Sequence, residues 1–402
     1  MRILMFGWEF PPYASGGLGT ACQGLVKGLA NHDQQIIFVA PRTPGSSDPK
    51  IKLLSAKDVE KKISLRNIPG IMAPYMTYEE YTQIKQSVEF KEGANPANLY
   101  GKNLFHEVYL FSERARYIAE SEDFDVIHCH DWLTFQAGIK AKEISKKPLV
   151  IHVHATEFDR TGGNAINEHV YKLEKEGMEK ADRIITVSNY TKKMVVEKYG
   201  ISPSKIDVVH NAVEFNESRF NSKISGNDKI VLFLGRLTLQ KGPDYFLYAA
   251  KRVIDIYPDV KFIVAGSGDM EPFMIEKAAE LGIADRMLFA GFLKGADVDK
   301  AYQMADLYVM PSVSEPFGIT PLEALRNNVP VIISRQSGVS EILENALKVD
   351  FWDIDDIANK IINVLHYSEL KDELSLNGSR EVRRFNWNTP AEKCIGVYNK
   401  LA

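Results

Sequence analysis

The chain has 402 residues, of which 45% are hydrophobic and 25% charged, a composition typical of a soluble globular protein with two or three domains. Its formal net charge of -4 supplies no strong positive field, which argues against nucleic acid or an acidic membrane surface as a partner. Three widely spaced cysteines, Cys22, Cys129 and Cys394, favour a reducing, cytoplasmic location over a disulfide framework. No apolar run approaches the roughly 18 residues needed to span a bilayer, and the short apolar start of the chain predicts a strand instead of a signal peptide.

Short apolar runs alternate with amphipathic stretches through the first half of the chain. Met1–Gly7 predicts the first strand and Gly19–Ala30 the first helix. Further strands are expected at Gln35–Ala40, Asp125–His130, Pro148–Val153, Arg183–Val187 and Ile206–Val209. Continuous β-branched runs between helices are typical of parallel strands buried on both faces, so the pattern predicts a doubly wound α/β domain. The less regular stretch Ile51–Asn98 is expected to be an insert whose secondary structure the sequence leaves open.

A polar segment separates this domain from a second one. Residues Glu214–Lys229 lose apolar periodicity and are rich in Asn and Ser, which is typical of a linker. The strand pattern then restarts at Ile230–Leu234, Val260–Ala265, Met287–Ala290, Leu307–Met310 and Val331–Ser334. We therefore expect two doubly wound, Rossmann-like domains, residues 1–214 and 215–384. Ligands in open α/β sheets bind beyond the carboxyl ends of the strands, so two such domains facing each other would form a cleft.

A glycine-rich turn, Gly16-Gly17-Leu18-Gly19, follows the first predicted strand and precedes the first helix. Glycine lets the backbone approach a ligand closely, and a helix N-terminus favours phosphate. A tight strand–helix turn without a ligand explains these residues equally well. The turn is not the dinucleotide motif G-x-G-x-x-G, because Cys22 occupies the third glycine position, and the chain contains no G-x-x-x-x-G-K-[ST].

Two turns of the second domain carry glycines, and the first of them also carries two cations. Gly235–Gly242, with the sequence GRLTLQKG, places Arg236 and Lys241 after the first strand of that domain. Fixed cations stabilise the negative charge that develops on a departing diphosphate, whereas the alternative is two solvated surface cations. Gly266 and Gly268 end a later strand and are expected to face a nucleotide.

A third motif, Glu315–Glu323 with the sequence EPFGITPLE, places two carboxylates eight residues apart across a turn. The backbone N–H groups of Phe317, Gly318 and Ile319 precede a helix and are candidates for phosphate binding. Thr320 and Glu323 also fit a capping box, which gives Glu323 a purely structural alternative. Glu315 has no such alternative, because it lies in a loop after a predicted strand.

Taken together, these motifs resemble those of retaining glycosyltransferases with the GT-B fold, and more narrowly family 4 and the enzymes similar to glycogen and starch synthases. The resemblance covers essentially the whole chain. It implies two Rossmann-like domains facing across a cleft, the second holding the donor and residues 385–402 crossing back onto the first, acceptor-side domain. It also implies that Glu315 contacts the transferred sugar and Glu323 the ribose, while Arg236 and Lys241 bind the donor diphosphate.

Histidines follow two strands of the first domain. His152 and His154 lie on one face of a strand, and the run His128–Asp131 adds further potential ligands, so a zinc site is an alternative interpretation. The resemblance implies instead that His154 lies near the transferred sugar and that Arg160 is a weaker contact of the donor or the acceptor. The residues expected to line the acceptor site or the cleft are Asp131, Trp132, Arg160 and Asn211, although a tryptophan is as often part of a core.

The implied reaction is transfer of a hexose, with glucose expected, from UDP- or ADP-sugar to an acceptor such as an α-glucan. Neither a metal nor a cofactor is expected, because cations and helix N-termini would stabilise the leaving diphosphate. Bacterial-type starch synthases carry a lysine where this chain has Ala14, so UDP-glucose is at least as well supported as ADP-glucose. Other acceptors (a sugar, lipid or small molecule), an epimerase or phosphorylase, a dehydrogenase and a non-catalytic nucleotide-sugar-binding protein are the alternatives, and the sequence leaves the oligomeric state open.

Overall fold

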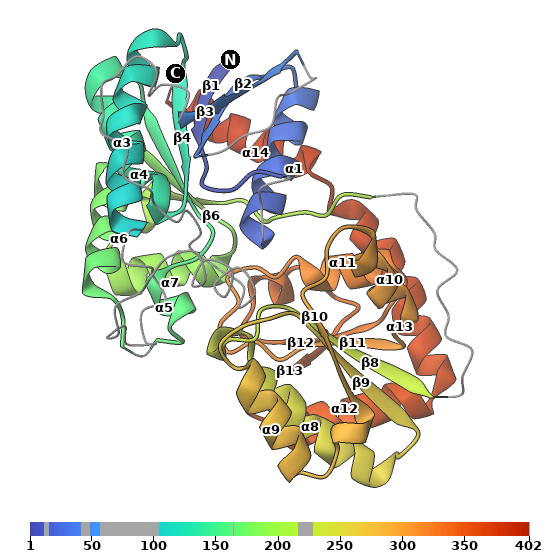
Figure 1. Cartoon of the computed structure of the whole chain (residues 1–402). Helices are drawn as coiled ribbons and strands as arrows, with labels where there is room; N and C mark the ends of the chain where they lie inside the picture. The colour runs from blue at the N-terminus through green and yellow to red at the C-terminus, as the bar shows by residue number, and fades with distance from the viewer. Residues whose placement is uncertain (12–15, 42–48, 57–103, 164, 216–227, 402) are drawn as a thin grey trace. The chain divides into compact units, whose positions relative to one another are not determined.

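The computed structural model describes residues 1–11, 16–41, 49–56, 104–163, 165–215 and 228–401 (Figure 1). Most of the expected linker Glu214–Lys229, namely residues 216–227, and most of the expected insert, residues 57–98, lie outside these ranges. The contacts within the chain define two compact units. The first comprises Met1–Glu157, Ile166–Asn211 and Trp387–Ala402, and the second Phe158–Ala165 and Ala212–Asn386.

In the described part of the first unit, seven parallel strands form a sheet. They are β1 (Arg2–Phe6), β2 (Gln35–Ala40), β3 (Ile51–Ser55), β4 (Val126–His130), β5 (Leu149–Val153), β6 (Arg183–Thr186) and β7 (Ile206–Val208). Their order across the sheet is β3-β2-β1-β4-β5-β6-β7. The order reverses between β1 and β4, and such a reversal creates a crevice beyond the carboxyl ends of the strands where ligands bind.

Helices cover both faces of this sheet (Figure 1). They are α1 (Gly17–Asn31), α3 (Leu104–Ser121), α4 (Trp132–Ser145), α6 (Glu168–Lys180), α7 (Asn189–Tyr199) and α14 (Asn388–Asn399). Helices α3, α4 and α6 pack side by side on one face, and α1 packs with α14 on the other. Two glycines of α1 make room for Trp387: a Cβ atom would lie 2.1 Å from its indole ring at Gly24 and 2.4 Å from its carbonyl oxygen at Gly28.

The described part of the second unit has its own parallel sheet of six strands. They are β8 (Lys229–Leu234), β9 (Val260–Ala265), β10 (Met287–Gly291), β11 (Leu307–Met310), β12 (Val331–Ser334) and β13 (Leu347–Val349). Their order is β10-β9-β8-β11-β12-β13, so the reversal lies between β8 and β11.

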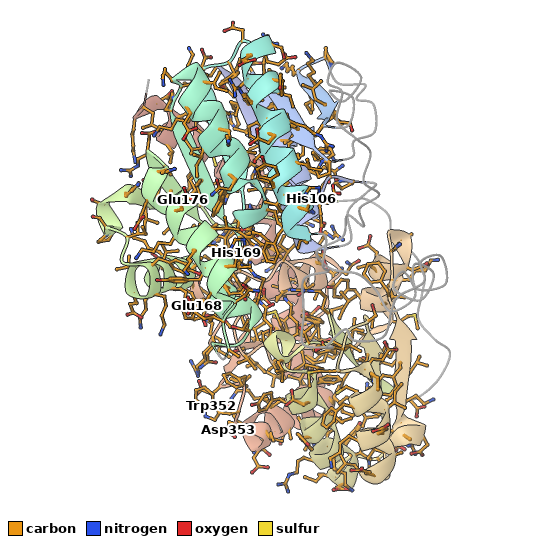
Figure 2. The ribbon with its side chains drawn as sticks, turned by 60° about the vertical axis from the view of Figure 1, so that its left-hand side comes forward. His106, Glu168, His169, Glu176, Trp352 and Asp353 are labelled. Carbon is orange, nitrogen blue, oxygen red and sulfur yellow. The ribbon has the colours of Figure 1, made fainter. Side chains whose placement is uncertain are left out.

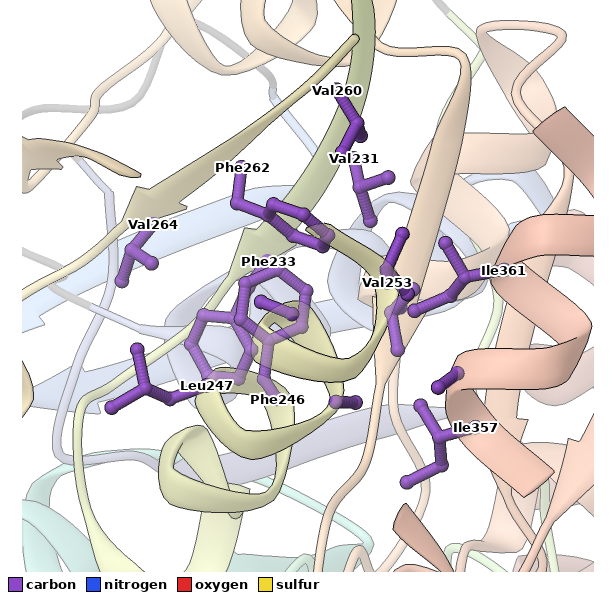
Figure 3. Close-up of a cluster of buried hydrophobic side chains, with 14 of the residues drawn as sticks. Val231, Phe233, Phe246, Leu247, Val253, Val260, Phe262, Val264, Ile357 and Ile361 are labelled. Carbon is purple, nitrogen blue, oxygen red and sulfur yellow. The ribbon is translucent and has the colours of Figure 1, made fainter. Parts of the chain in front are cut away.

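Six α-helices flank this sheet in the described residues. They are α8 (Pro243–Ile256), α9 (Glu271–Glu280), α10 (Ala296–Met304), α11 (Thr320–Arg326), α12 (Ile354–His366) and α13 (Ser368–Glu381). Helix α12 packs against α8 and against β11, β12 and β13. Phe246 of α8, Phe262 of β9 and Ile361 of α12 are completely buried in the core of this unit (Figure 3). Burying each such side chain contributes about 1.5–3 kcal/mol. Asp353, labelled in Figure 2, begins α12 by accepting the backbone N–H of Asp356 at 2.9 Å.

The two doubly wound sheets predicted from the sequence are confirmed, and each predicted strand forms to within about two residues of its expected bounds. Two edge strands were not predicted. β3 lies in the stretch that was interpreted as an irregular insert, and β13 has three residues, too few for a recognisable pattern. Across the described residues, every helix is too short or too polar to cross a membrane.

Candidate functional site

Two loops of the second unit meet where its strand order reverses. The loop after β8 runs through the short 3₁₀ helix η3 (Leu239–Lys241) into α8, and the loop after β11 runs into α11. A small pocket opens between them, and its polar lining comes from Lys241, Tyr308, Ser312, Glu315 and Thr320. Strand adjacency thus brings together Lys241 and Glu315, two residues that the sequence analysis selected from separate motifs.

Lys241 and Glu315 form a largely buried ion pair beside this pocket. The Lys241 Nζ atom lies 2.5 Å from Glu315 Oε2, and the two side chains are 22% and 8% exposed. The Ser312 hydroxyl donates to the same carboxylate oxygen at 3.2 Å. A buried carboxylate without a partner would cost several kcal/mol, and Lys241 and Ser312 together supply the partners of Glu315 at the edge of the pocket.

Glycines allow the two loops to approach each other. Gly242 has a φ of +62°, and a Cβ atom there would lie 2.2 Å from the Pro311 carbonyl oxygen. Gly318 has a φ of +95°, and its Cβ would lie 3.1 Å from Glu315 Cγ. The backbone of Glu315 is fixed as well, because its N–H donates to the Gln336 carbonyl at 3.0 Å. The pair is therefore held by backbone geometry that larger residues would disrupt.

The loop after β9 packs directly on the loop after β8. Gly266 has a φ of +145°, and a Cβ atom there would lie 1.8 Å from the Gly235 carbonyl oxygen. At Gly268 the corresponding atom would lie 2.3 Å from the Leu237 carbonyl oxygen. The contact between these two loops thus requires glycine at both positions, independently of their predicted role in nucleotide binding. Arg236, half-buried in the same region, donates to Gln240 Oε1 at 3.2 Å.

Glu323 projects from α11 toward the hydroxyl of Tyr302, which lies 3.1 Å from its Oε2 atom. Burial is the main cause that raises the pKa of the Glu323 carboxyl. The capping-box interpretation is wrong: Ile319 precedes the helix, no side chain caps its first turn, and Thr320 is already helical. The Thr320 hydroxyl is instead occupied by Tyr308, whose hydroxyl donates to it at 2.8 Å.

The turn before α11 contains the remaining predicted phosphate-binding residues. Phe317 is buried, and its carbonyl accepts the N–H of Val339 at 2.7 Å. Gly318 and Ile319 follow it and lead into the helix, with Pro321 in the first helical turn. The turn is therefore anchored on one side and continuous with α11 on the other.

In the first unit, the predicted glycine turn begins α1. Gly16 directly precedes the helix, Gly17 is its first residue, and Gly19 is buried in its first turn. A Cβ atom at Gly16 or Gly17 would meet no described atom within 4 Å. Gly16 has extended backbone, with a φ of −157°. In the described surroundings, neither packing nor conformation explains a glycine at these two positions.

Asp131 fixes the turn that carries His154. Its Oδ1 atom accepts the backbone N–H of His154 at 2.7 Å and that of Ala155 at 3.3 Å. The His154 Nε2 atom lies 2.9 Å from Nδ1 of His130. Burial lowers the pKa of His154 to about 3, so its ring is neutral at neutral pH. The predicted cleft residue Asp131 is thus a backbone anchor for His154 in this structure.

The other predicted cleft residues are largely buried. Trp132 is 2% exposed and packs against Phe105 with ring centroids 5.8 Å apart, so its ring face is covered and not available for stacking on a sugar. Arg160 is 6% exposed and ends α5 (Glu157–Arg160). Asn211 is 8% exposed and ends the segment Ile166–Asn211 of the first unit.

The sequence did not predict the hydroxyl groups that lie around the pocket and beside Glu323. Ser312 contacts Glu315, Tyr302 contacts Glu323, and Tyr308 contacts Thr320. None of the three belongs to a recognisable motif, and only the adjacency of β8, β11 and the neighbouring helices brings them to the site. The position of Ser312 just beyond a strand end was the one available signal.

Comparison with known proteins gives matches over both units. The family model described as Glycosyltransferase Family 4 matches residues 15–217, and that described as Glycosyl transferases group 1 matches residues 214–381. An uncharacterized glycosyltransferase of Methanocaldococcus jannaschii is 29% identical over 99% of this chain and 98% of its own length. A glycogen synthase of Mycobacterium tuberculosis is 28% identical over 86% of this chain and 80% of its own length. The solved structure of sucrose-phosphate synthase from Thermosynechococcus elongatus is similar with a TM-score of 0.76 at 20% identity, covering 100% of this chain and 98% of that one.

Proposed function

The chain belongs to glycosyltransferase family 4 and has the GT-B fold, and we propose that it transfers a hexose from a nucleotide-sugar donor to an acceptor hydroxyl with retention of the anomeric configuration. The second unit binds the donor in this proposal, and the first unit supplies the acceptor side. The observation that carries it is the Lys241–Glu315 pair beside a pocket at the β8/β11 reversal.

A nucleotide-sugar presents sugar hydroxyls and a diphosphate, and the pair offers one group for each. A carboxylate accepts hydrogen bonds from hydroxyls, and an ammonium group binds phosphate as a point charge. We expect donor binding to separate the pair, with Lys241 turning to the diphosphate and Glu315 to the sugar. Arg236, from the same loop, supplies a second cation that stabilises the departing diphosphate.

The remaining residues have roles that suit their surroundings. Glu323, oriented by Tyr302, accepts hydrogen bonds from the ribose hydroxyls. The open positions at Gly16 and Gly17 let the start of α1 approach the donor closely. His154 is neutral at neutral pH, so it binds near the transferred sugar through a ring nitrogen and not through charge.

The reaction proceeds on one face of the sugar. The acceptor oxygen forms a bond to the anomeric carbon as the bond from that carbon to the diphosphate oxygen breaks. The acceptor proton passes to the departing diphosphate, and no covalent enzyme intermediate forms. Closure of the site around the donor would exclude water, which otherwise competes with the acceptor.

Glucose is the proposed sugar and an α-glucan the proposed acceptor, with UDP or ADP as the nucleotide. Support comes from the relative named glycogen synthase, which covers most of the chain. The structural neighbour named sucrose-phosphate synthase points to a product of a different kind, a sugar phosphate, so other acceptors remain the second candidate.

The deciding measurement is nucleotide diphosphate release from UDP-glucose and from ADP-glucose, each with and without maltohexaose. Release that requires maltohexaose supports an α-glucan synthase and identifies its nucleotide. Release of equal rate without acceptor contradicts transfer and points to hydrolysis or another reaction of the donor. No release in any mixture contradicts the proposed donor or acceptor.

Variants then test the proposed role of Glu315. Glu315→Gln should abolish release while UDP or ADP still binds, because Lys241 becomes free for the diphosphate. Glu276→Gln removes an exposed carboxylate from α9 of the same unit and should leave both properties unchanged. Equal loss of release and of nucleotide binding in Glu315→Gln would contradict a role confined to the sugar.

A further inference from the structure

Four histidines gather on one face of the first sheet near the carboxyl ends of β4 and β5. His128 and His130 are two residues apart on β4 and therefore point to the same face. The register of β4 and β5 places His152 directly opposite His130. Ring centroids are 4.5 Å apart for His128 and His130 and 5.3 Å apart for His130 and His152. His154 extends the cluster by stacking on His152 at 4.3 Å.

Two ring nitrogens in this cluster have no hydrogen-bond partner among the described residues. They are the Nε2 atoms of His130 and His152, whose residues are 0% and 2% exposed. Leaving a buried polar atom without a hydrogen bond costs about 1–3 kcal/mol. A bound ion or water molecule is a common reason why such an atom occurs in a native protein. The remaining nitrogens of the three rings make contacts within the cluster or with α14.

These contacts hold the rings in fixed orientations. The Nδ1 atom of His128 lies 2.6 Å from the Tyr398 hydroxyl of α14, and its Nε2 atom lies 3.2 Å from Nδ1 of His152. The Nδ1 atom of His130 lies 2.9 Å from Nε2 of His154. The bonds at Nδ1 of His128 and of His130 orient these rings as in metal-binding histidines, by a hydrogen bond at the ring nitrogen that does not touch the ion. The Nε2 atom of His128 is then the nitrogen left to bind the ion, and it would exchange its contact with His152 Nδ1 for the ion.

One ring nitrogen from each of His128, His130 and His152 lies within 4.8 Å of the others. Three imidazoles are the protein ligands of known zinc sites, with Zn–N bonds of about 2.0–2.1 Å. Nitrogens around a tetrahedral ion are then about 3.4 Å apart, a distance that small rotations of the three rings would reach. The unpartnered Nε2 atoms of His130 and His152 are suited to be two of the ligands.

The type of donor atom in the cluster also favours particular ions. Imidazole nitrogen is a preferred donor for zinc, copper and nickel and a poor one for magnesium and calcium.

We propose that His128, His130 and His152 bind a divalent transition-metal ion, with Zn²⁺ as the ion of choice. The ion links β4 to β5 and, through His128 and Tyr398, to α14, so its role is structural. The proposal assigns it no part in sugar transfer and does not depend on that activity. A second group, formed by Cys22, His130 and His154, shares one ligand with this site and is the competing location.

The test uses the full-length protein, stripped with EDTA and dialysed into metal-free buffer. Calorimetric titration with Zn²⁺ should give one equivalent bound, and the same ion should raise the melting temperature, because a ligand that binds only the folded state stabilises it. Titration with Co²⁺ should produce visible absorption bands of a nitrogen-ligated ion. Failure of the wild-type protein to bind either ion overturns the proposal.

Variants locate the ion. His152→Gln should weaken binding at least about tenfold, and Tyr398→Phe, which keeps all three ligands, should weaken it by about tenfold through loss of the bond to His128. His169→Gln, at an exposed histidine of α6 labelled in Figure 2, is the matched control and should bind as the wild type does. Circular dichroism establishes that each variant is folded, and Tyr398→Phe provides the test if His152→Gln is not. Loss of binding in Cys22→Ser together with full binding in His152→Gln overturns the proposal in favour of the competing group.

Discussion

Removing Lys241 should destabilise the second unit much more than removing the charge of Glu315. Lys241→Met deletes the ammonium but keeps most of the alkyl chain, and it leaves the Glu315 carboxylate 8% exposed with the Ser312 hydroxyl as a remaining side-chain donor. Glu315→Gln leaves instead a lysine that is 22% exposed and can turn toward water. The two variants delete the same ion pair. The difference between their losses of stability therefore measures the cost of leaving the Glu315 carboxylate buried without a cation.

The magnitude follows from the burial of the pair. Breaking a fully buried ion pair from one side costs about 3–5 kcal/mol. This pair is partly exposed on the lysine side and Ser312 stays in place, so we expect about 2–3 kcal/mol for Lys241→Met. For Glu315→Gln we expect about 1 kcal/mol or less, and the double variant should recover most of the loss.

Amide hydrogen exchange is the appropriate assay because it reports the stability of one unit without assuming two-state unfolding of the whole chain. Peptides covering β8 and β11 should exchange about 30- to 150-fold faster in Lys241→Met, which corresponds to about 2–3 kcal/mol at 1.4 kcal/mol per tenfold change. Peptides of the first unit serve as the internal reference. Equal acceleration in Lys241→Met and Glu315→Gln would refute this explanation.

Two further substitutions test other contacts of the site. Gly266→Ala should lower the free energy of unfolding by roughly 3 kcal/mol or more, because the position has a φ of +145° and a Cβ atom there would lie 1.8 Å from the Gly235 carbonyl oxygen. Gly282→Ala is the control: its φ is +67° and the space around it is open, so it should cost about 1 kcal/mol. Urea denaturation compares them, and similar losses at the two positions would contradict the argument from backbone contact. Tyr302→Phe removes the hydroxyl that contacts Glu323 and should raise the dissociation constant of the donor's nucleotide diphosphate by about tenfold. The same substitution at Tyr367, which is 53% exposed, is the control, and an unchanged constant in Tyr302→Phe would argue against Glu323 as a nucleotide contact.

The fold could be predicted from the sequence because its signals are local. A continuous β-branched run such as Gln35–Ala40 specifies a buried parallel strand within six residues, and the polar segment after Glu214 interrupts the pattern on its own. The motifs around Lys241 and Glu315 were visible for the same reason, since each lies just beyond a predicted strand. β3 and β13 were missed because they are short or half-buried edge strands, in which the apolar pattern is weak.

Contacts between distant residues could not be predicted in this way. Lys241 and Glu315 are 74 residues apart, and they pair because β8 and β11 are neighbours in the sheet. The same holds for Glu323, for which the sequence suggested a helix cap, whereas the fold places it beside a tyrosine of another helix. His130 and His152 are separate motifs in the sequence and become opposite neighbours only through the register of β4 and β5. Local periodicity and turn chemistry thus determined the elements and the motifs at their ends, while strand order and register, which depend on the packing of the whole unit, decided which of those side chains meet.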